Sequence, residues 1–339
     1  MNLTEETLLK ERLSKPQKIA VVGHKNPDGD AVGSCLALAQ VLKKLKHQVQ
    51  VIFPDAFPYF LNFLPETNRC LYYDQQPSEV SQCIDEASLI FTLDFNDLKR
   101  VGDLSLVLSQ AKADFVMIDH HIAPADYARF TYSDIRSSST AEMVYHFLYK
   151  MDALSFIDAS VADCLYTGIM TDTGSFRFPN TSAETHRIIA DLIDKGAQKV
   201  RVHESVYDVN SPERIQLLGC ALQNLRLLSD FRTAYISLSQ EELDRYHYQK
   251  GFTEGFVNYG LSIENIVFAI LFSENKRENM IKISFRSKGN FSVNNFARAH
   301  FEGGGHQNAA GGKSTLSLED TIKKCVSLLP DYKQQLLDA

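Results

Sequence analysis

The sequence predicts an α/β protein of two domains: a parallel-sheet domain with helices on both faces, then a smaller α/β domain. Apolar strands alternate with amphipathic helices through the first part of the chain, a pattern typical of a mostly parallel sheet. Three of these strands end in charged residues, and the pattern changes after residue 197. The length of 339 residues also favours about two domains.

The elements of the first domain follow from the spacing of apolar residues. We expect a helix capped by Thr4 and ending near Leu13. We expect strands at 18–24, 48–53, 87–94 and 113–121, and further helices at 30–46, 140–151, 158–174 and 181–197. The helix at 30–46 carries apolar residues at helical spacing, and Asp30 at its start is by itself a candidate N-cap.

The remainder of the chain predicts a connection and a second domain. Residues 200–228 have amphipathic helical character, and strands follow at 232–239, 265–274 and 279–289. A helix opened by Ser292, a glycine-rich loop at 302–314 and a helix at 318–329 complete the domain. We therefore expect a first domain at 1–196, a helical linker at 197–226 and a second domain at 227–339.

Composition excludes several classes of protein. The net charge of −7 and the lack of a basic tract argue against capture of long duplex nucleic acid. Six cysteines without a CxxC pair argue against a structural zinc site and for a reducing cytosol. The first 15 residues do not resemble a signal peptide, and no apolar run approaches the roughly 20 residues of a membrane span. We expect a cytoplasmic protein with no membrane partner.

Ionisable residues gather at the ends of the predicted strands. They are His24, Asp28 and Asp30 after the first strand, Asp94 after a later one, Asp119, His120 and His121 after the next, and Asp172 in a helix. Ligands of parallel sheets bind at the carboxyl ends of the strands. Carboxylates and imidazoles without thiolates suit Mn, Fe or Mg. Asp94 is a natural bridge between two ions, as in two-metal phosphoryl-transfer sites.

Each residue also has an ordinary structural interpretation. An aspartate before a helix is often only an N-cap, paired histidines can form a solvated corner, and Asp172 can be a helix C-terminal residue. These interpretations leave unexplained why three strand ends are all acidic, so we favour the metal site.

Four motifs in the same order resemble the DHH phosphoesterases. They are "HKNPDGDAVGS" from His24, "DHH" at 119–121, "GIMTDTGSFRFPNTS" at 168–182 and "GGGH" at 303–306. The last motif is similar to that of the DHH-associated C-terminal domain. With "SFRSKG" ahead of it, the chain most resembles the oligoribonuclease (nanoRNase) and pAp phosphatase type. Bulky Phe95 departs from the family pattern, in which small residues commonly follow the aspartate of the second motif.

The resemblance implies a site in the cleft between the two domains and a role for each matched residue. Two divalent ions, most commonly Mn²⁺ in this family, would activate water. One ion would be held by His24, Asp28 and Asp94, and the other by Asp30, Asp94, His120 and Asp172. Asp119 would orient a neighbouring imidazole, and His121 would face the phosphate or the leaving oxygen. Substrate would be bound by Arg286, Asn294, Gly303, Gly304, Gly305 and His306.

The expected function is therefore a manganese-dependent phosphoesterase. Its expected substrates are short RNA oligonucleotides, cleaved to nucleoside monophosphates, and adenosine 3′,5′-bisphosphate (pAp). The alternatives are a phosphodiesterase for linear or cyclic dinucleotides and a non-catalytic nucleotide-binding protein, whose expected mark is a lost metal ligand. A RecJ-type exonuclease fits less well, because it would usually need additional nucleic-acid-binding mass. An inorganic pyrophosphatase shares the first domain, but its second domain differs and lacks the GGGH motif. The protein could also assemble as a homodimer.

Overall fold

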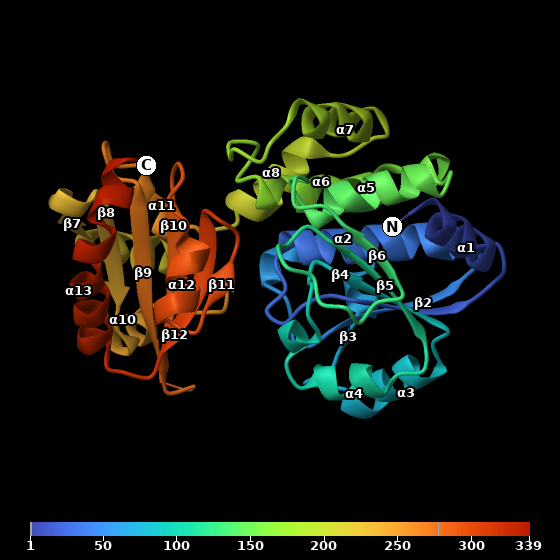
Figure 1. Ribbon diagram of the computed structural model, residues 1–339, viewed down its shortest axis with the longest axis horizontal. Coiled ribbons are helices and arrows are strands. Elements are labelled where there is room, and N and C mark those ends of the chain that lie inside the picture. The colour runs from blue at the N-terminus through green and yellow to red at the C-terminus, as the bar shows by residue number, and fades with distance from the viewer. Residues whose placement is uncertain (1, 277) are drawn as a thin grey trace. The chain divides into compact units, whose positions relative to one another are not determined.

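The computed structural model describes residues 2–276 and 278–339, which divide into two compact units with the boundary between Val209 and Asn210 (Figure 1). The boundary lies within the range 197–226 that the sequence predicts as a linker. Within this range, Lys199–Tyr207 form a helix of the first unit and Pro212–Gln223 form a helix of the second.

The first unit contains a parallel sheet of six strands in the order β3-β2-β1-β4-β5-β6. The strands are β1 (Lys18–Val22), β2 (Gln48–Phe53), β3 (Leu71–Tyr72), β4 (Leu89–Leu93), β5 (Asp114–Asp119) and β6 (Phe130–Ser133). The helices are α1 (Leu3–Leu13), α2 (Gly29–Lys44), α3 (Pro77–Glu86), α4 (Leu104–Gln110), α5 (Thr140–Lys150), α6 (Ala159–Asp172), α7 (Ala183–Asp194) and α8 (Lys199–Tyr207). The predicted parallel sheet is confirmed.

Helices cover both faces of this sheet, as Figure 1 shows, with α2, α5 and α6 on one face and α3 and α4 on the other. Successive strand residues point to opposite faces. In β1, Ile19 and Val21 pack in the core under α2, whereas Ala20 and Val22 pack in the core under α3 and α4. Both faces of the sheet are buried, which explains why the sequence of β1 is a continuous apolar run.

A close contact between helices α2 and α6 holds two of the candidate metal ligands in place. A Cβ atom added to Gly33 of α2 would lie 2.4 Å from the carbonyl oxygen of Cys164 in α6. Only glycine therefore allows the two backbones to approach this closely. The contact holds the start of α2, which carries Asp30, against α6, which ends at Asp172.

The second unit contains a mixed sheet of six strands in the order β11-β12-β10-β9-β8-β7, in which only β8 and β9 run parallel. The strands are β7 (Arg226–Leu228), β8 (Thr233–Leu238), β9 (Phe268–Asn275), β10 (Met280–Ser287), β11 (Gly304–Gly305) and β12 (Ala309–Ser314). The helices are α9 (Pro212–Gln223), α10 (Gln240–Arg245), α11 (Phe256–Leu261), α12 (Val293–His300) and α13 (Leu318–Leu337). One face packs on α12 and α13, and the other on α9, α10 and α11.

Several local predictions differ from the structure. Asn2, not Thr4, caps α1, because its side chain accepts from the Glu5 amide in a reciprocal capping box. The predicted glycine-rich loop at 302–314 is largely a pair of strands, β11 and β12. Helix α13 continues beyond its predicted end at 329 despite Pro330, because Leu329 and Leu336 are both buried against the sheet.

Several helices and strands of the structure are not predicted by the sequence patterns. They are β3, β6, α3, α4, α10 and α11, and the range 200–228 contains strand β7 besides its helices. Apart from α3, which has ten residues, these elements are short and carry too few apolar positions for a clear period.

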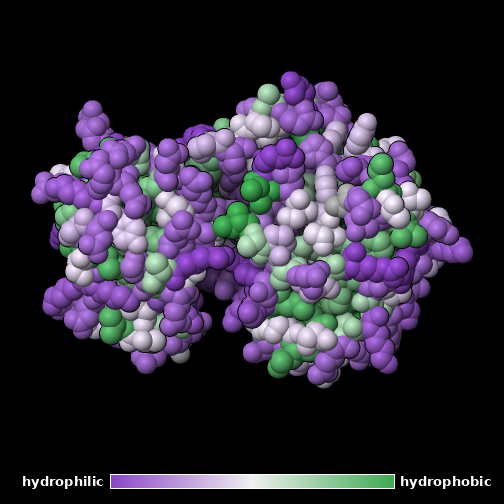
Figure 2. Space-filling model, in the orientation of Figure 1, coloured by the Kyte–Doolittle hydropathy of each residue, from purple (hydrophilic) through white to green (hydrophobic). Residues whose placement is uncertain are grey.

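Both units are covered mainly by hydrophilic side chains on the face shown in Figure 2, with hydrophobic residues in small separate areas. Among the described residues, no helix combines the length and the apolar character needed to cross a lipid bilayer.

Candidate metal centre

The candidate site lies where the strand order reverses direction. Strands β1 and β4 are neighbours, and the chain continues from them toward opposite edges of the sheet. Such a reversal opens a crevice at the carboxyl ends of the strands, where ligands of open α/β sheets bind. His24 follows β1, Asp94 follows β4, and His120 follows β5. The sheet thus brings together residues that are far apart in the sequence.

The first group of candidate ligands surrounds His24. Its Nε2 lies 3.3 Å from Oδ2 of Asp94 and 3.9 Å from Oδ1 of Asp28. Asp28, not Asp30, is the N-cap of α2, since its Oδ1 accepts from the amides of Asp30 and Ala31. The start of α2 therefore places the Asp28 carboxylate beside His24.

The second group surrounds His120. Its Nε2 lies 3.8 Å from Asp30, 3.7 Å from Asp94 and 3.5 Å from Asp172, in each case measured to a carboxylate oxygen. Asp94 belongs to both groups: Oδ2 faces His24 and Oδ1 faces His120. One carboxylate with an oxygen in each group is the arrangement of a bridging ligand.

The orientation of both imidazoles suits metal binding. The Nδ1 atom of His24 lies 2.9 Å from the carbonyl oxygen of Lys25, and that of His120 lies 3.2 Å from the carbonyl oxygen of Ser137. A carbonyl at Nδ1 favours a proton there, which directs the lone pair of Nε2 toward the carboxylates. Metal-binding histidines are held in this way. Ser137 lies outside the four sequence motifs.

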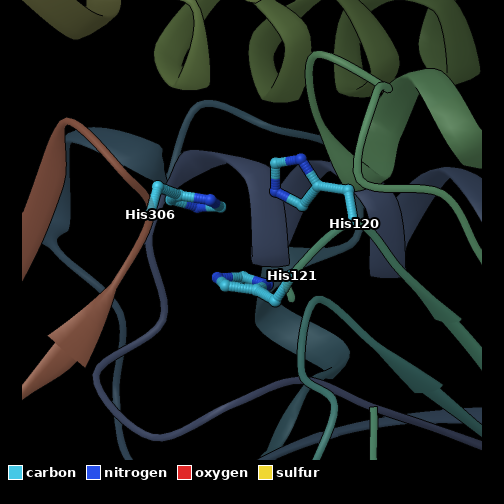
Figure 3. A group of neighbouring side chains, drawn as sticks. All are labelled: His120, His121 and His306. Atoms are coloured by element: carbon cyan, nitrogen blue, oxygen red, sulfur yellow. The ribbon is translucent and has the colours of Figure 1, made fainter. Parts of the chain in front are cut away.

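His121 is arranged differently from His120. Figure 3 shows both rings projecting to the same side from the segment after β5, and their centroids are 5.0 Å apart. The carboxylate of Asp119 accepts from the His121 amide, at 2.9 Å, and lies 2.7 Å from His121 Nδ1. Asp119 is fully buried. The imidazole that Asp119 orients is thus that of His121.

The start of α5 supplies contacts that sequence reasoning missed. The amides of Thr140 and Ala141 donate to the Asp30 carboxylate at 2.6 and 2.8 Å. The Thr140 hydroxyl donates to Asp94 at 2.9 Å. Ser139 caps the helix through the amide of Glu142. This "S-T-x-E" signal predicts a helix start, but no local pattern shows that the start faces Asp30.

Crowding of buried charges shifts the pKa values of these groups. Burial raises the pKa of Asp172, and although the His120 charge opposes this, the Asp94 and Asp28 charges add to it, so that the pKa is about 6. Burial also raises the pKa of Asp30 well above its ordinary value, although the Ala141 amide opposes this. For His24, burial lowers the pKa, but the hydrogen bond to Asp94 and the charges of Asp28 and Asp94 raise it to about 9.

The donor set fits divalent cations. Four carboxylates and two carbonyl-oriented imidazoles converge, and the six cysteine thiols are not among the grouped donors of the described residues. Oxygen and imidazole donors suit Mn²⁺, Mg²⁺ or Fe²⁺. Cations would also offset the negative charge that otherwise favours protonation of Asp30 and Asp172.

The remaining candidate residues lie in the second unit. Arg286 is on β10 opposite Ala309 of β12, and Gly305 of β11 pairs with Ala310, so all lie near one end of the sheet. The amide of His306 donates to the Ala309 carbonyl at 2.7 Å, which closes the hairpin.

Asn294 is 2% exposed, and its Oδ1 accepts from the Gly305 amide at 2.9 Å. This hydrogen bond joins Asn294 to the glycine segment that contains Gly305. Gly303 and Gly304 lie in the same hairpin, where a Cβ at Gly303 would meet the carbonyl oxygen of Gly311 at 2.0 Å.

Comparison with known proteins identifies relatives over the whole chain. The sequence model of the DHH family N-terminal domain matches residues 18–169, and that of the DHHA1 domain matches residues 243–332. A bifunctional oligoribonuclease and PAP phosphatase NrnA of Thermus thermophilus is 29% identical, covering 95% of this chain and 91% of the relative. The NrnA protein of Bacillus subtilis is 26% identical, covering 90% and 92%.

A solved structure extends this similarity. The crystal structure of an exopolyphosphatase-related protein of Bacteroides fragilis superposes with a TM-score of 0.94 at 39% identity, covering 99% of this chain and 98% of that one.

Proposed function

Since this chain belongs to the DHH family of phosphoesterases and carries a DHHA1 domain, we propose that it is a manganese-dependent oligoribonuclease. Its substrates are short RNA oligonucleotides, hydrolysed to nucleoside monophosphates, and pAp, hydrolysed to AMP. Full-length similarity to the two NrnA proteins supports this substrate class. The catalytic part of the proposal rests on two groups of carboxylates and carbonyl-oriented imidazoles that share Asp94.

Bound divalent cations would supply Lewis-acid chemistry, which makes water more acidic and offsets charge on phosphoryl oxygens. His24, Asp28 and Asp94 would hold one ion, and Asp94 with Asp30, His120 and Asp172 the other. All six side chains are present, so the mark expected of a non-catalytic relative, a lost ligand, is not seen at these positions.

His121 has a separate role in this proposal. Its Nδ1 is held by Asp119, so the ring is oriented and its Nε2 is directed away from that carboxylate. From this position it donates a proton to the leaving oxygen or contacts the phosphate. The Asp119 carboxylate, buried and bonded to both the amide and the ring of His121, keeps the ring in place.

The second unit binds the rest of the substrate in this proposal. The planar guanidinium of Arg286 suits an oxyanion, and the glycine hairpin before His306 allows a ligand to approach the backbone. Asn294 holds that hairpin through Gly305.

A substrate panel tests the proposal. The protein is stripped with a chelator, reloaded with Mn²⁺, Mg²⁺ or Zn²⁺, and offered a diribonucleotide, a pentaribonucleotide, long RNA, pAp, a cyclic dinucleotide and pyrophosphate. We expect no activity without metal, restoration by Mn²⁺, and the highest kcat/KM for the short RNAs and pAp. A preference for the cyclic dinucleotide would favour the signalling phosphodiesterase, and a preference for pyrophosphate or long RNA would contradict the proposal.

A further inference from the structure

Two cationic side chains beside His24 have no role in the site as described so far. Lys25 follows His24 directly, and Arg100 lies on the 3-10 helix η3 (Leu98–Val101) that follows Asp94. The amide of Lys25 donates to the carbonyl oxygen of Arg100 at 2.9 Å. This bond ties the segment after β1 to the segment after β4. It places both residues at the switch point, on the side of the centre that holds His24.

The path of the Lys25 side chain follows from Gly102. Gly102 ends η3 with φ +58°, a conformation that favours glycine. A Cβ added there would lie 3.1 Å from Cδ and 3.7 Å from Nζ of Lys25. The lysine therefore extends along the same short helix that carries Arg100.

Neither cation is neutralised by a carboxylate. Within the described residues no Asp or Glu oxygen lies within 4.0 Å of Lys25 or Arg100, and both side chains are exposed. Lys99, the neighbour of Arg100 on η3, differs because its Nζ lies 4.0 Å from Asp97. In a protein of net charge −7, two such cations next to a phosphoesterase centre can attract an anion.

We propose that Lys25 and Arg100 form an anion subsite for a substrate phosphate that is not being hydrolysed. This inference rests on the proposed function, whose substrates carry a second phosphate. Arg100 offers a planar fork that matches a phosphate, and Lys25 adds a point charge. The subsite favours pAp and oligonucleotides with a terminal phosphate over substrates that have only the scissile one. It belongs to the first unit, whereas Arg286 and the glycine hairpin belong to the second.

Paired substrates test the subsite. Initial rates are measured on diadenylate with and without a 5′-phosphate for the wild type, Lys25→Gln, Arg100→Gln, the double variant and the control Lys99→Gln. The double variant lowers the ratio of kcat/KM for the phosphorylated over the unphosphorylated substrate roughly tenfold, the effect of losing hydrogen bonds to a charged group. Lys99→Gln keeps the wild-type ratio, and bound manganese is unchanged in every variant.

A binding measurement separates this inference from the proposed function. Calorimetry with pAp on the Mn²⁺-loaded protein should show roughly tenfold weaker binding by the double variant than by the wild type or Lys99→Gln. Equal binding by all three proteins, or equal losses on both dinucleotides, would overturn the subsite. If the wild type cleaves neither dinucleotide but the binding difference persists, the subsite stands and the proposed function is wrong.

Discussion

Asp94 shows at the scale of one residue how the backbone serves the site. It adopts φ +65°, a left-handed conformation that is costly for a residue other than glycine. The turn ends β4, directs the carboxylate toward both histidine groups and sends Phe95 into the core under α3 and α4. Phe95 is fully buried, so this departure from the family motif is absorbed by packing away from the carboxylates.

Substitution of Asp94 tests the bridge. Asp94→Ala removes a donor from both groups, so we expect both ions to bind more weakly and turnover to fall by more than about 100-fold, the upper loss seen for mere supporting residues. Metal content by plasma mass spectrometry and kcat on a diribonucleotide measure this. Asp103→Asn, an exposed carboxylate without a side-chain cap bond, is the control. Two bound ions with normal turnover in Asp94→Ala would contradict the bridge.

His121 allows the opposite test, since it is not needed as a metal ligand in our proposal. We expect His121→Ala to keep its metal content yet lose turnover by about 10²–10⁴-fold, as for a general acid. Asp119→Asn should lose less, because the ring remains but is held less firmly. Loss of metal from His121→Ala would place this histidine among the ligands and refute its separate role.

At the scale of the elements, helix α5 connects the centre to the rest of the first unit. Its N-terminus directs two amides at Asp30, where the helix dipole also favours a negative charge. In the same first turn, Glu142 is 4% exposed and accepts from the hydroxyls of Ser138 and Thr185. Thr185 belongs to the capping box of α7, so this one carboxylate joins α5, α7 and the segment ahead of the site.

The pH dependence of stability tests the role of Glu142. Burial raises its pKa, but the nearby His146 imidazole and the hydrogen bonds from Ser138 and Thr185 lower it more, so the net pKa lies below the ordinary value. Its stabilisation is therefore present above the pKa of unfolded glutamate, about 4.3, and is lost as the pH falls through the folded pKa. Glu142→Gln should cost about 1–2 kcal/mol at neutral pH and less in acid.

Urea unfolding of the first unit at neutral and acidic pH measures the effect. Glu184→Gln is the matched control, because this α7 carboxylate is half exposed and pairs with Arg187. A Glu142→Gln penalty that is the same at both pH values would show that shape, not charge, matters at this position.

At the scale of the whole molecule, the chain combines two units with different sheets. The parallel sheet carries the carboxylates and imidazoles of the candidate metal centre, and the mixed sheet contains Arg286 and the glycine hairpin. We propose that the second unit matters most for substrates with a group beyond the scissile phosphate, because only these give it something to hold.

Arg286→Ala tests this division. We expect a higher apparent KM for diribonucleotide and pAp, roughly tenfold for a lost charged hydrogen bond. A nitrophenyl phosphoester should be hydrolysed nearly as by the wild type, and metal content should not change. Lys282→Ala, on the same strand but paired with Glu278, is the control. Equal damage to both substrates would assign Arg286 to the fold or the chemistry, and no damage would make it a surface residue.

The sequence by itself determined the features that depend on local order. The apolar runs of β1, β4 and β5 and the acidic residues that follow them predict the parallel sheet and indicate which edge carries the candidate site, because strand periodicity and buried faces are local properties. The motifs resembling the DHH family identified the residues that gather at this edge.

Only the tertiary structure decided how those residues meet. It turned α5 so that Thr140 and Ala141 bond Asp30, used Asp28 rather than Asp30 as the cap of α2, and paired the glycine segment as β11 and β12. It also joined Lys25 to Arg100 across the switch point. The bonds of α5 to Asp30 and of Lys25 to Arg100 link segments that are far apart in the sequence. The distance between such segments depends on how whole helices and strands pack, a property that no short window of sequence contains.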